Sequence, residues 1–272
     1  MHKMKLEIGF GDYDRTRVMS DGSISIDGVD ATFHTYRIVS EVFEAMIRRR
    51  AFDVAELGMT YFLRTMDFDD TPFFAIPVFP SRCFRHSAIY TNVERGIDKP
   101  EDLAGKTVGE FALYGHDAGV WPKGILSDEF GLKPDQCRWI TGALDWPLKP
   151  IDFIPHVHPK GIHITQASPD RDLGEMLATG EVDALISADV PKCILHKSPK
   201  VARLFADYEV TEREYYQRTG IFPIMHTVAV RRDLAKQHPD IVQAVYRGFC
   251  AAKDAVRERY TRGMIFNNVS RR

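Results

Sequence analysis

Two ten-residue segments in distant parts of the chain align without a gap. They are residues 46–55 (MIRRRAFDVA) and 176–185 (MLATGEVDAL), and each has the pattern of a helix end, a turn and an apolar strand. In both segments an aspartate, Asp53 or Asp183, follows the turn and precedes the strand. The repeat predicts two similar α/β units, although joints between helices and strands can also converge on such a pattern.

The hydrophobic periodicity around these segments alternates between strands and helices. Strand patterns occupy residues 6–10, 29–36, 52–57, 73–78, 87–90, 106–111, 138–141 and 220–231. One helical pattern begins at Ser40. Three others cover residues 99–104, residues 118–130, which end at Gly131, and residues 239–260. In open parallel α/β sheets, ligands bind in the crevice at the carboxyl ends of the strands. We therefore expect the functional site at those ends.

The composition excludes several classes of function. The 272 residues include 36 Lys and Arg and 38 Asp and Glu, so a net charge of -2 provides no field for nucleic acid or an anionic membrane. The first ten residues carry Lys3, Lys5 and Glu7, unlike a secretory signal, and residues 71–81 are too short and proline-rich to span a bilayer. The four widely spaced cysteines favour free thiols in a reducing compartment. We expect a cytoplasmic protein with no nucleic-acid or membrane partner, and homo-oligomerisation stays open.

Four segments carry a resemblance to a known family: residues 77–90 (PVFPSRCFRHSAIY), 99–109 (KPEDLAGKTVG), 180–187 (GEVDALIS) and 218–226 (RTGIFPIMH). In this order, over almost the whole chain, they resemble the 4,5-dihydroxyphthalate decarboxylases. The resemblance implies an α/β, two-lobed, type II periplasmic-binding-protein-like fold with an interlobe cleft. It places lobe I at residues 1–91 and 221–272 and lobe II at residues 92–220, and it implies a further C-terminal segment beyond residue 272.

The same resemblance implies a carboxy-lyase of aromatic catabolism. Its reaction would convert 4,5-dihydroxyphthalate to protocatechuate and carbon dioxide, with a small aromatic acid as partner and without an organic cofactor. The alternative is a solute-binding protein for a small aromatic or carboxylic acid that performs no catalysis. The sequence departs from the plainer family pattern at residues 115–117 (GHD) and 188–190 (ADV), which leaves the substrate open.

Arginines are the candidates for binding the carboxylates of such a ligand, because a planar guanidinium donates two parallel hydrogen bonds to a carboxylate. Arg82 and Arg85 lie in a proline-rich segment, and either could instead point to solvent. Tyr13 and Arg15 directly follow the first strand, and Asp189 follows a later one, so position alone makes these three residues candidates for ligand contacts.

Three histidines are candidates for the proton donor, since imidazole titrates near neutral pH. They are His226, with His86 and His116 as alternatives, and each could instead be a structural residue. Spacing alone defines no divalent-metal site. A metal held by His86, His116, Asp117 and His226 stays open, whereas His156, His158 and His163 lie in a segment typical of an exposed turn. The sequence contains no nucleotide-binding loop.

Overall fold

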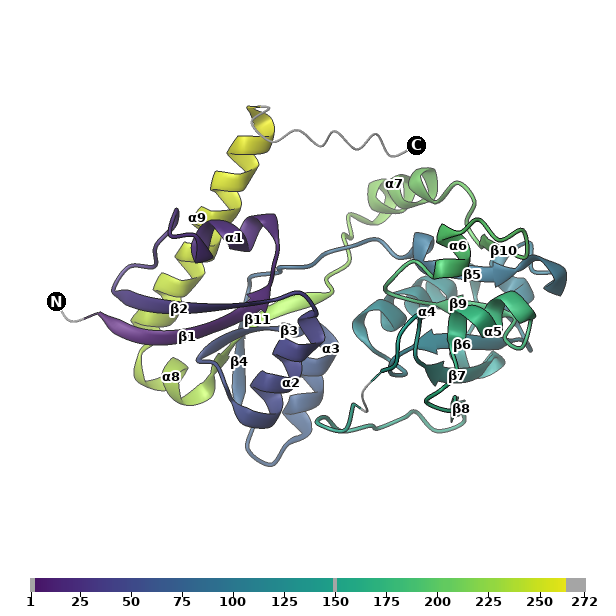
Figure 1. Cartoon of the computed structure of the whole chain (residues 1–272), viewed down its shortest axis with the longest axis horizontal. Helices are drawn as coiled ribbons and strands as arrows, with labels where there is room; N and C mark the ends of the chain where they lie inside the picture. The colour runs from purple at the N-terminus through teal and green to yellow at the C-terminus, as the bar shows by residue number, and fades with distance from the viewer. Residues whose placement is uncertain (1–2, 149–150, 263–272) are drawn as a thin grey trace. The chain divides into compact units, whose positions relative to one another are not determined.

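The computed structural model describes residues 3–148 and 151–262 of the chain (Figure 1). The chain divides into two compact units. The first is formed by Met1–Ser81 with His226–Arg272, and the second by Arg82–Met225. The limits predicted from the sequence, at residues 91 and 221, differ from these. The strand β5 (Ile89–Asn92) pairs with β9 and β10 of the second unit, so the chain leaves the first unit before this strand.

The described part of the first unit contains a five-stranded sheet with the order β2-β1-β3-β11-β4. Its strands are β1 (Met4–Gly11), β2 (Val29–Tyr36), β3 (Val54–Gly58), β4 (Phe73–Ile76) and β11 (His226–Arg231). β1 is parallel to β2 and β3, whereas β11 is antiparallel to both β3 and β4. The strand predicted at residues 220–231 is wrong in its first half. Pro223, which has no N–H to donate to a ladder, precedes the strand.

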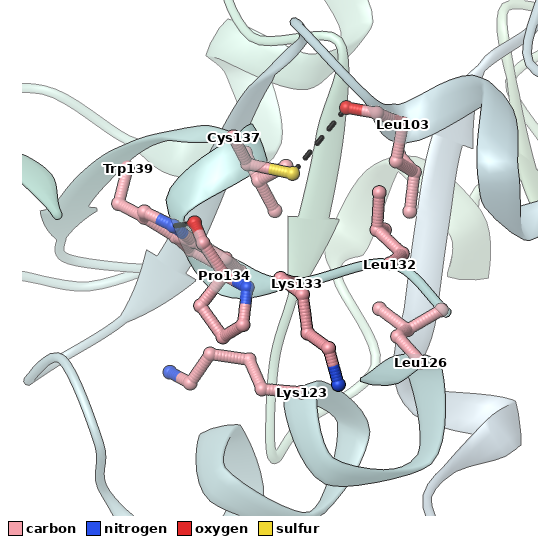
Figure 2. A pocket seen from close by; sticks show the side chains of 9 residues that line it. Leu103, Lys123, Leu126, Leu132, Lys133, Pro134, Cys137 and Trp139 are labelled. Carbon is pink, nitrogen blue, oxygen red and sulfur yellow. Dashed lines mark hydrogen bonds between the residues drawn. The ribbon is translucent and has the colours of Figure 1, made fainter. Parts of the chain in front are cut away.

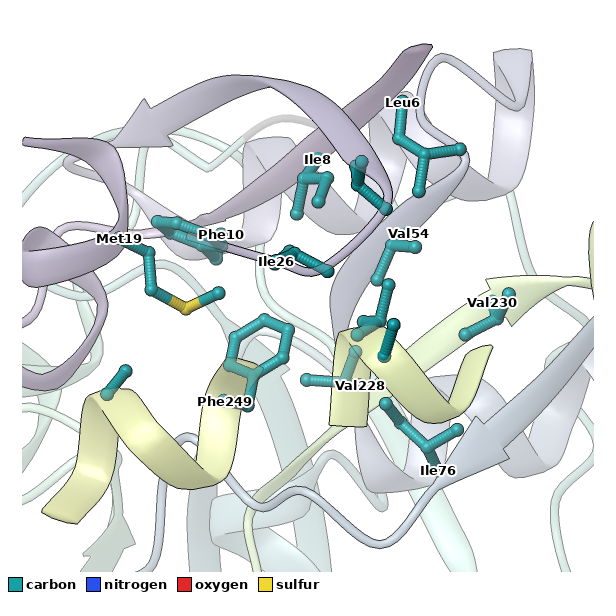
Figure 3. Close-up of a cluster of buried hydrophobic side chains, with 14 of the residues drawn as sticks. Leu6, Ile8, Phe10, Met19, Ile26, Val54, Ile76, Val228, Val230 and Phe249 are labelled. Atoms are coloured by element: carbon teal, nitrogen blue, oxygen red, sulfur yellow. The ribbon is translucent and has the colours of Figure 1, made fainter. Parts of the chain in front are cut away.

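The helices of the first unit follow from apolar spacing and from their end residues. They are α1 (Asp14–Ser20), α2 (Val39–Arg49), α3 (Met59–Arg64), the 3₁₀ turn η1 (Thr65–Asp67), α8 (Arg232–Gln237) and α9 (Pro239–Thr261). α9 and α1 pack together over the buried cluster in Figure 3, where Phe249 of α9 meets Phe10 of β1 edge to face at 6.2 Å. This apolar core holds the carboxyl end of β1 in place.

The described part of the second unit contains a six-stranded sheet with the order β10-β5-β9-β6-β7-β8. Besides β5, its strands are β6 (Thr107–Phe111), β7 (Arg138–Gly142), β8 (His163–Gln166), β9 (Ala184–Ile186) and β10 (Val201–Arg203). Its helices are α4 (Asp117–Phe130), α5 (Leu173–Thr179), α6 (Lys192–Leu195) and α7 (Tyr208–Thr219). The 3₁₀ turns are η2 (His86–Ala88), η3 (Val93–Arg95), η4 (Pro100–Leu103) and η5 (Pro134–Gln136). The predicted helix at 99–104 is therefore only a 3₁₀ turn, and the strand predicted at 87–90 begins at Ile89.

The aligned segments of the sequence form the same joint in both units. In the first, Oδ2 of Asp53 accepts the backbone N–H of Glu7 at 2.8 Å, and in the second, Oδ2 of Asp183 accepts that of Thr107 at 2.8 Å. Each aspartate thus ties the start of one strand to its parallel neighbour. The helix before each joint ends in a left-handed residue, Arg50 with φ 49° and Gly180 with φ 79°. The prediction of two similar α/β units is confirmed.

Candidate functional site

The first unit buries a glutamate in an otherwise apolar strand. Glu56 of β3 is 1% exposed and lies opposite Val228 of β11. A buried carboxylate needs hydrogen-bond donors to offset its lost hydration. Three donors surround Glu56: the backbone N–H of Gly11 and the phenol of Tyr13, both at 2.9 Å, and Nδ1 of His226 at 2.6 Å. The carboxylate of Glu56 is therefore the common acceptor of a hydrogen-bonded cluster and not an isolated charge.

The ends of three elements bring these residues together. Gly11 ends β1, Tyr13 is the N-cap residue of α1, and His226 begins β11 opposite Gly58, the last residue of β3. The side chain of Tyr13 folds back over Gly11, where an added Cβ would lie 2.6 Å from Cζ of the tyrosine. Glycine at position 11 is thus required for Tyr13 to reach Glu56.

The contacts of Glu56 define which nitrogen of His226 carries a hydrogen. Burial and the negative charge of Glu56 raise the pKa of Tyr13, so the phenol stays protonated and donates to the carboxylate. Because the carboxylate only accepts, Nδ1 of His226 donates and Nε2 is the nitrogen left for a ligand. The ring of Phe43 packs edge-on against the imidazole at 5.2 Å, and the His226 side chain retains 14% exposure. The imidazole is oriented and accessible.

Arg15 adds a positive charge to this cluster. Its guanidinium lies 4.1 Å from the centre of the Tyr13 ring, and its Nε donates to the carbonyl of Pro80 at 2.5 Å. A second contact joins Nη1 to Asp14 at 3.2 Å. The structure thus brings together three of the residues predicted from the sequence, Tyr13, Arg15 and His226.

The second unit contains a comparable carboxylate and imidazole pair. Glu110 of β6 is completely buried, and its Oε1 accepts the backbone N–H of Gly115 at 2.9 Å and Nδ1 of His116 at 3.3 Å. Its other oxygen accepts from Nζ of Lys123. Burial opposes the charge of Glu110, but Lys123 and His116 outweigh it and lower the pKa of the carboxyl group. Glu110 therefore stays ionised and holds His116 at the N-cap of α4.

Arg85 and Arg82 occupy different environments in this unit. Arg85 is 9% exposed, and its guanidinium makes weak contacts with Sδ of Met225 at 3.2 Å and with the carbonyl of Ala188 at 3.4 Å. Arg82 is exposed and donates twice to the carbonyl of Phe222, at 3.2 and 2.7 Å. Arg82 thus hydrogen-bonds to the backbone of Phe222, whereas the guanidinium of Arg85 is buried and has few strong acceptors.

Asp189 lies at the same edge of the sheet as Arg85. It follows β9, and the carbonyl of the preceding residue accepts from Arg85. Burial of its carboxyl group raises the pKa of Asp189, and the positive charges of Arg85 and His116 partly offset that rise. Asp189 therefore interacts electrostatically with both Arg85 and His116.

His86 lies in an apolar surrounding that disfavours a proton donor. The residue is completely buried between the rings of Phe205, at 5.3 Å, and Tyr215, at 5.1 Å. Neither ring nitrogen has a hydrogen-bond partner among the described residues, and burial lowers the pKa of the imidazole. A neutral, shielded imidazole is poorly suited to deliver a proton.

The described residues contain no group of three or more His, Cys, Asp or Glu side chains arranged to hold a metal ion. A pocket of about 10 Å³ in the second unit is lined by apolar groups and by the two lysines shown in Figure 2. In its wall, the thiol of Cys137 donates a hydrogen bond to the carbonyl of Leu103. Such a volume holds about one water molecule and no aromatic acid. Over the same described ranges, no helix is long and apolar enough to cross a membrane.

Sequence reasoning missed Glu56 and Glu110, the two residues on which both clusters depend. Each is a single acid within a buried strand, VAELG for β3 and TVGEF for β6. An ionisable residue at an inward position of an apolar strand is the signal that could have identified them, because burial demands a partner.

Comparison with solved structures defines the class of fold. The aliphatic sulphonate binding protein SsuA of Escherichia coli matches 95% of this chain and 76% of its own, with a TM-score of 0.55 and 15% identity. SsuA of Xanthomonas axonopodis pv. citri, an alkanesulfonate-binding protein bound to MOPS, matches 97% of this chain and 77% of its own, with a TM-score of 0.55 and 15% identity. The chain therefore has the α/β fold of the periplasmic binding proteins, as predicted.

Sequence relatives define the family. A 4,5-dihydroxyphthalate decarboxylase of Comamonas testosteroni is 37% identical over 249 residues, which are 92% of this chain and 74% of the relative. The enzyme of the same name from Pseudomonas putida is 34% identical over 80% of this chain and 83% of its own. No protein-family model matches the sequence. The chain belongs to the 4,5-dihydroxyphthalate decarboxylase family.

Proposed function

We propose that this protein is a carboxy-lyase that converts 4,5-dihydroxyphthalate to protocatechuate and carbon dioxide. The observation that carries the proposal is the 37% identity to a decarboxylase of that name over 92% of the chain. The solved binding proteins share only the fold, at 15% identity, and a fold by itself does not determine an activity.

The substrate makes this reaction feasible without an organic cofactor. Each carboxylate of 4,5-dihydroxyphthalate lies para to a hydroxyl group, whose oxygen donates electrons into the ring. A proton then adds to the carbon that bears the carboxylate. The bond to the carboxylate breaks, its electron pair returns to the ring, and carbon dioxide leaves as aromaticity is restored. The net change is the uptake of one proton for each carbon dioxide released, so the protein must supply a proton donor.

We assign that role to His226, with Glu56 as its positioning residue. The carboxylate of Glu56 accepts from Nδ1 at 2.6 Å, which directs Nε2 outward and compensates the positive charge of the ring when Nε2 also holds a proton. Tyr13 and Gly11 donate two further hydrogen bonds to Glu56. The carboxylate thus does not need to take the proton itself.

Arg85 is the better of the two predicted arginines for binding a substrate carboxylate. A buried guanidinium whose contacts are a thioether and a carbonyl at 3.4 Å retains donors for a planar anion. Arg82 already donates twice to Phe222 and lies exposed. The predicted interlobe cleft stays a prediction.

Incubation of purified protein with 4,5-dihydroxyphthalate tests the proposal. Carbon dioxide and protocatechuate are followed with and without a chelator, and we expect both products in equal amounts over many turnovers. Turnover that survives the chelator would support proton transfer by protein groups alone. Tight binding of the diacid without release of carbon dioxide would overturn the proposal in favour of a solute-binding protein.

A further inference from the structure

The second carboxylate and imidazole pair has a feature that the proposed reaction does not use. His116 is 6% exposed, and its Nδ1 faces two acceptors, the carbonyl of Leu113 at 3.1 Å and Oε1 of Glu110 at 3.3 Å. In the neutral imidazole, Nδ1 therefore carries the hydrogen and Nε2 has a lone pair. Nε2 is buried and has no hydrogen-bond partner among the described residues. A buried acceptor without a donor destabilises the fold, so its presence indicates a donor that a ligand supplies.

The groups around His116 indicate what kind of ligand would donate a hydrogen bond to its Nε2. Asp189 interacts electrostatically with both His116 and Arg85, and Arg85 donates to the carbonyl of Ala188, so this edge of the second unit's sheet also offers a guanidinium for a carboxylate. Glu110 accepts hydrogen bonds from Gly115, His116 and Lys123, and it keeps the imidazole in one orientation. A fixed acceptor and a guanidinium that both interact with Asp189 match a ligand that carries a hydroxyl group and a carboxylate.

We propose that Nε2 of His116 accepts a hydrogen bond from a phenolic hydroxyl of the ligand, with Glu110 as the positioning residue. This inference rests on the proposed function, and it names the group that recognises a ring hydroxyl of the ligand. A ligand without hydroxyl groups leaves the lone pair of His116 unsatisfied. The site therefore selects hydroxylated aromatic acids over plain ones.

Two unreactive ligands test the inference, 3,4-dihydroxybenzoate and benzoate, which differ only in their hydroxyl groups. Calorimetry on the full chain should give a Kd for 3,4-dihydroxybenzoate about tenfold or more below that for benzoate, as expected for one buried hydrogen bond. His116→Asn keeps a donor where Nδ1 lies but removes the acceptor at Nε2. The variant should bring the ratio of the two Kd values close to one and leave the Kd of benzoate unchanged.

His116→Leu serves as a second variant should the asparagine variant not fold. It should likewise bring the ratio of the two Kd values close to one. His196→Asn, at an exposed position after α6, is the matched control and should keep the wild-type ratio. An unchanged ratio in the His116 variants would overturn the inference, as would equal weakening of both ligands, which indicates a structural role. Discrimination through His116 without any release of carbon dioxide from 4,5-dihydroxyphthalate would refute the proposed activity and support the hydroxyl site.

Discussion

Oε1 of Glu56 lies 2.6 Å from Nδ1 of His226, which joins two residues 170 positions apart in the chain. The contact depends on the pairing of β3 with β11, since His226 lies opposite Gly58 and Glu56 points from the same strand two residues earlier. An imidazole held by a buried carboxylate through one nitrogen presents the other nitrogen in a defined direction. The antiparallel addition of β11 to the sheet thus creates the proposed proton donor.

Replacement of His226 by asparagine should lower kcat by about a hundredfold to ten-thousandfold, the usual contribution of a well-placed acid or base. The amide of asparagine can still donate to Glu56, so the thermal stability should change little. Steady-state kinetics and a thermal melt measure the two quantities. His34→Asn is the control, because His34 also contacts a glutamate, Glu7, but at a more exposed position. Wild-type turnover by His226→Asn would contradict the assignment.

Replacement of Glu56 by glutamine should act through His226. The glutamine amide can present its NH₂ group toward Nδ1 and no longer selects the productive tautomer, so kcat should fall by about tenfold or more. The double variant Glu56→Gln/His226→Asn should be no slower than His226→Asn alone, because the two residues act as a unit. Additive losses in this cycle would show that Glu56 contributes independently of the imidazole.

Replacement of Arg85 by lysine should raise KM by about tenfold or more with a smaller effect on kcat. A lysine ammonium is a single point charge and cannot reproduce two parallel hydrogen bonds to a carboxylate. The same change at Arg82 should leave KM near the wild-type value, since Arg82 contacts the backbone of Phe222. The reverse result, with KM raised only in Arg82→Lys, would move the anion site to Arg82.

The sequence predicted the α/β class and the joints at Asp53 and Asp183 because strand and helix periods are local properties. It did not predict α7, which buries only Tyr215 and has no apolar stripe from which a helical period could be read. It also missed the helix α1, whose seven residues are too few for a clear period.

The candidate site was predictable only in part. His226 stood out because imidazole chemistry attaches to the residue type itself and the residue closes an apolar segment. The partners of Glu56 could not be derived, since they depend on the register between strands that are distant in the chain. His86 is less suited to donate a proton than its residue type indicates, because Phe205 and Tyr215 enclose its ring, which the sequence does not reveal.

The stability of the protein should depend on pH through Glu110. Its pKa in the folded state lies below the ordinary value of 4.5, despite burial, because of Lys123 and His116. A carboxyl group whose pKa is lower in the folded state than in the unfolded state stabilises the fold at pH values above the unfolded-state pKa. This contribution is lost as the pH falls through the folded-state pKa. Urea unfolding should therefore show Glu110→Gln to be less stable than the wild type at pH 7, with a difference that shrinks on acidification. A difference independent of pH would contradict the ionised state of Glu110.

Gly119 tests how closely α4 approaches the carboxylate of Glu110. A Cβ added at this position would lie 1.7 Å from Oε1 of Glu110 and 2.9 Å from Nδ1 of His116. Glu110 is completely buried and cannot withdraw into solvent. Gly119→Ala should therefore lower the free energy of unfolding by about 1–3 kcal/mol, as overpacked core positions do.

The matched control lies in the same helix, at Gly124, where an added Cβ meets nothing within 4 Å. Gly124→Ala gains helix propensity and should raise the free energy of unfolding by up to about 1 kcal/mol. The same substitution in one helix thus has opposite signs at two positions, and denaturant titration of both variants measures them. Destabilisation by both would mean that the helix tolerates no change, whereas stabilisation by both would mean that Glu110 and His116 can move apart without cost.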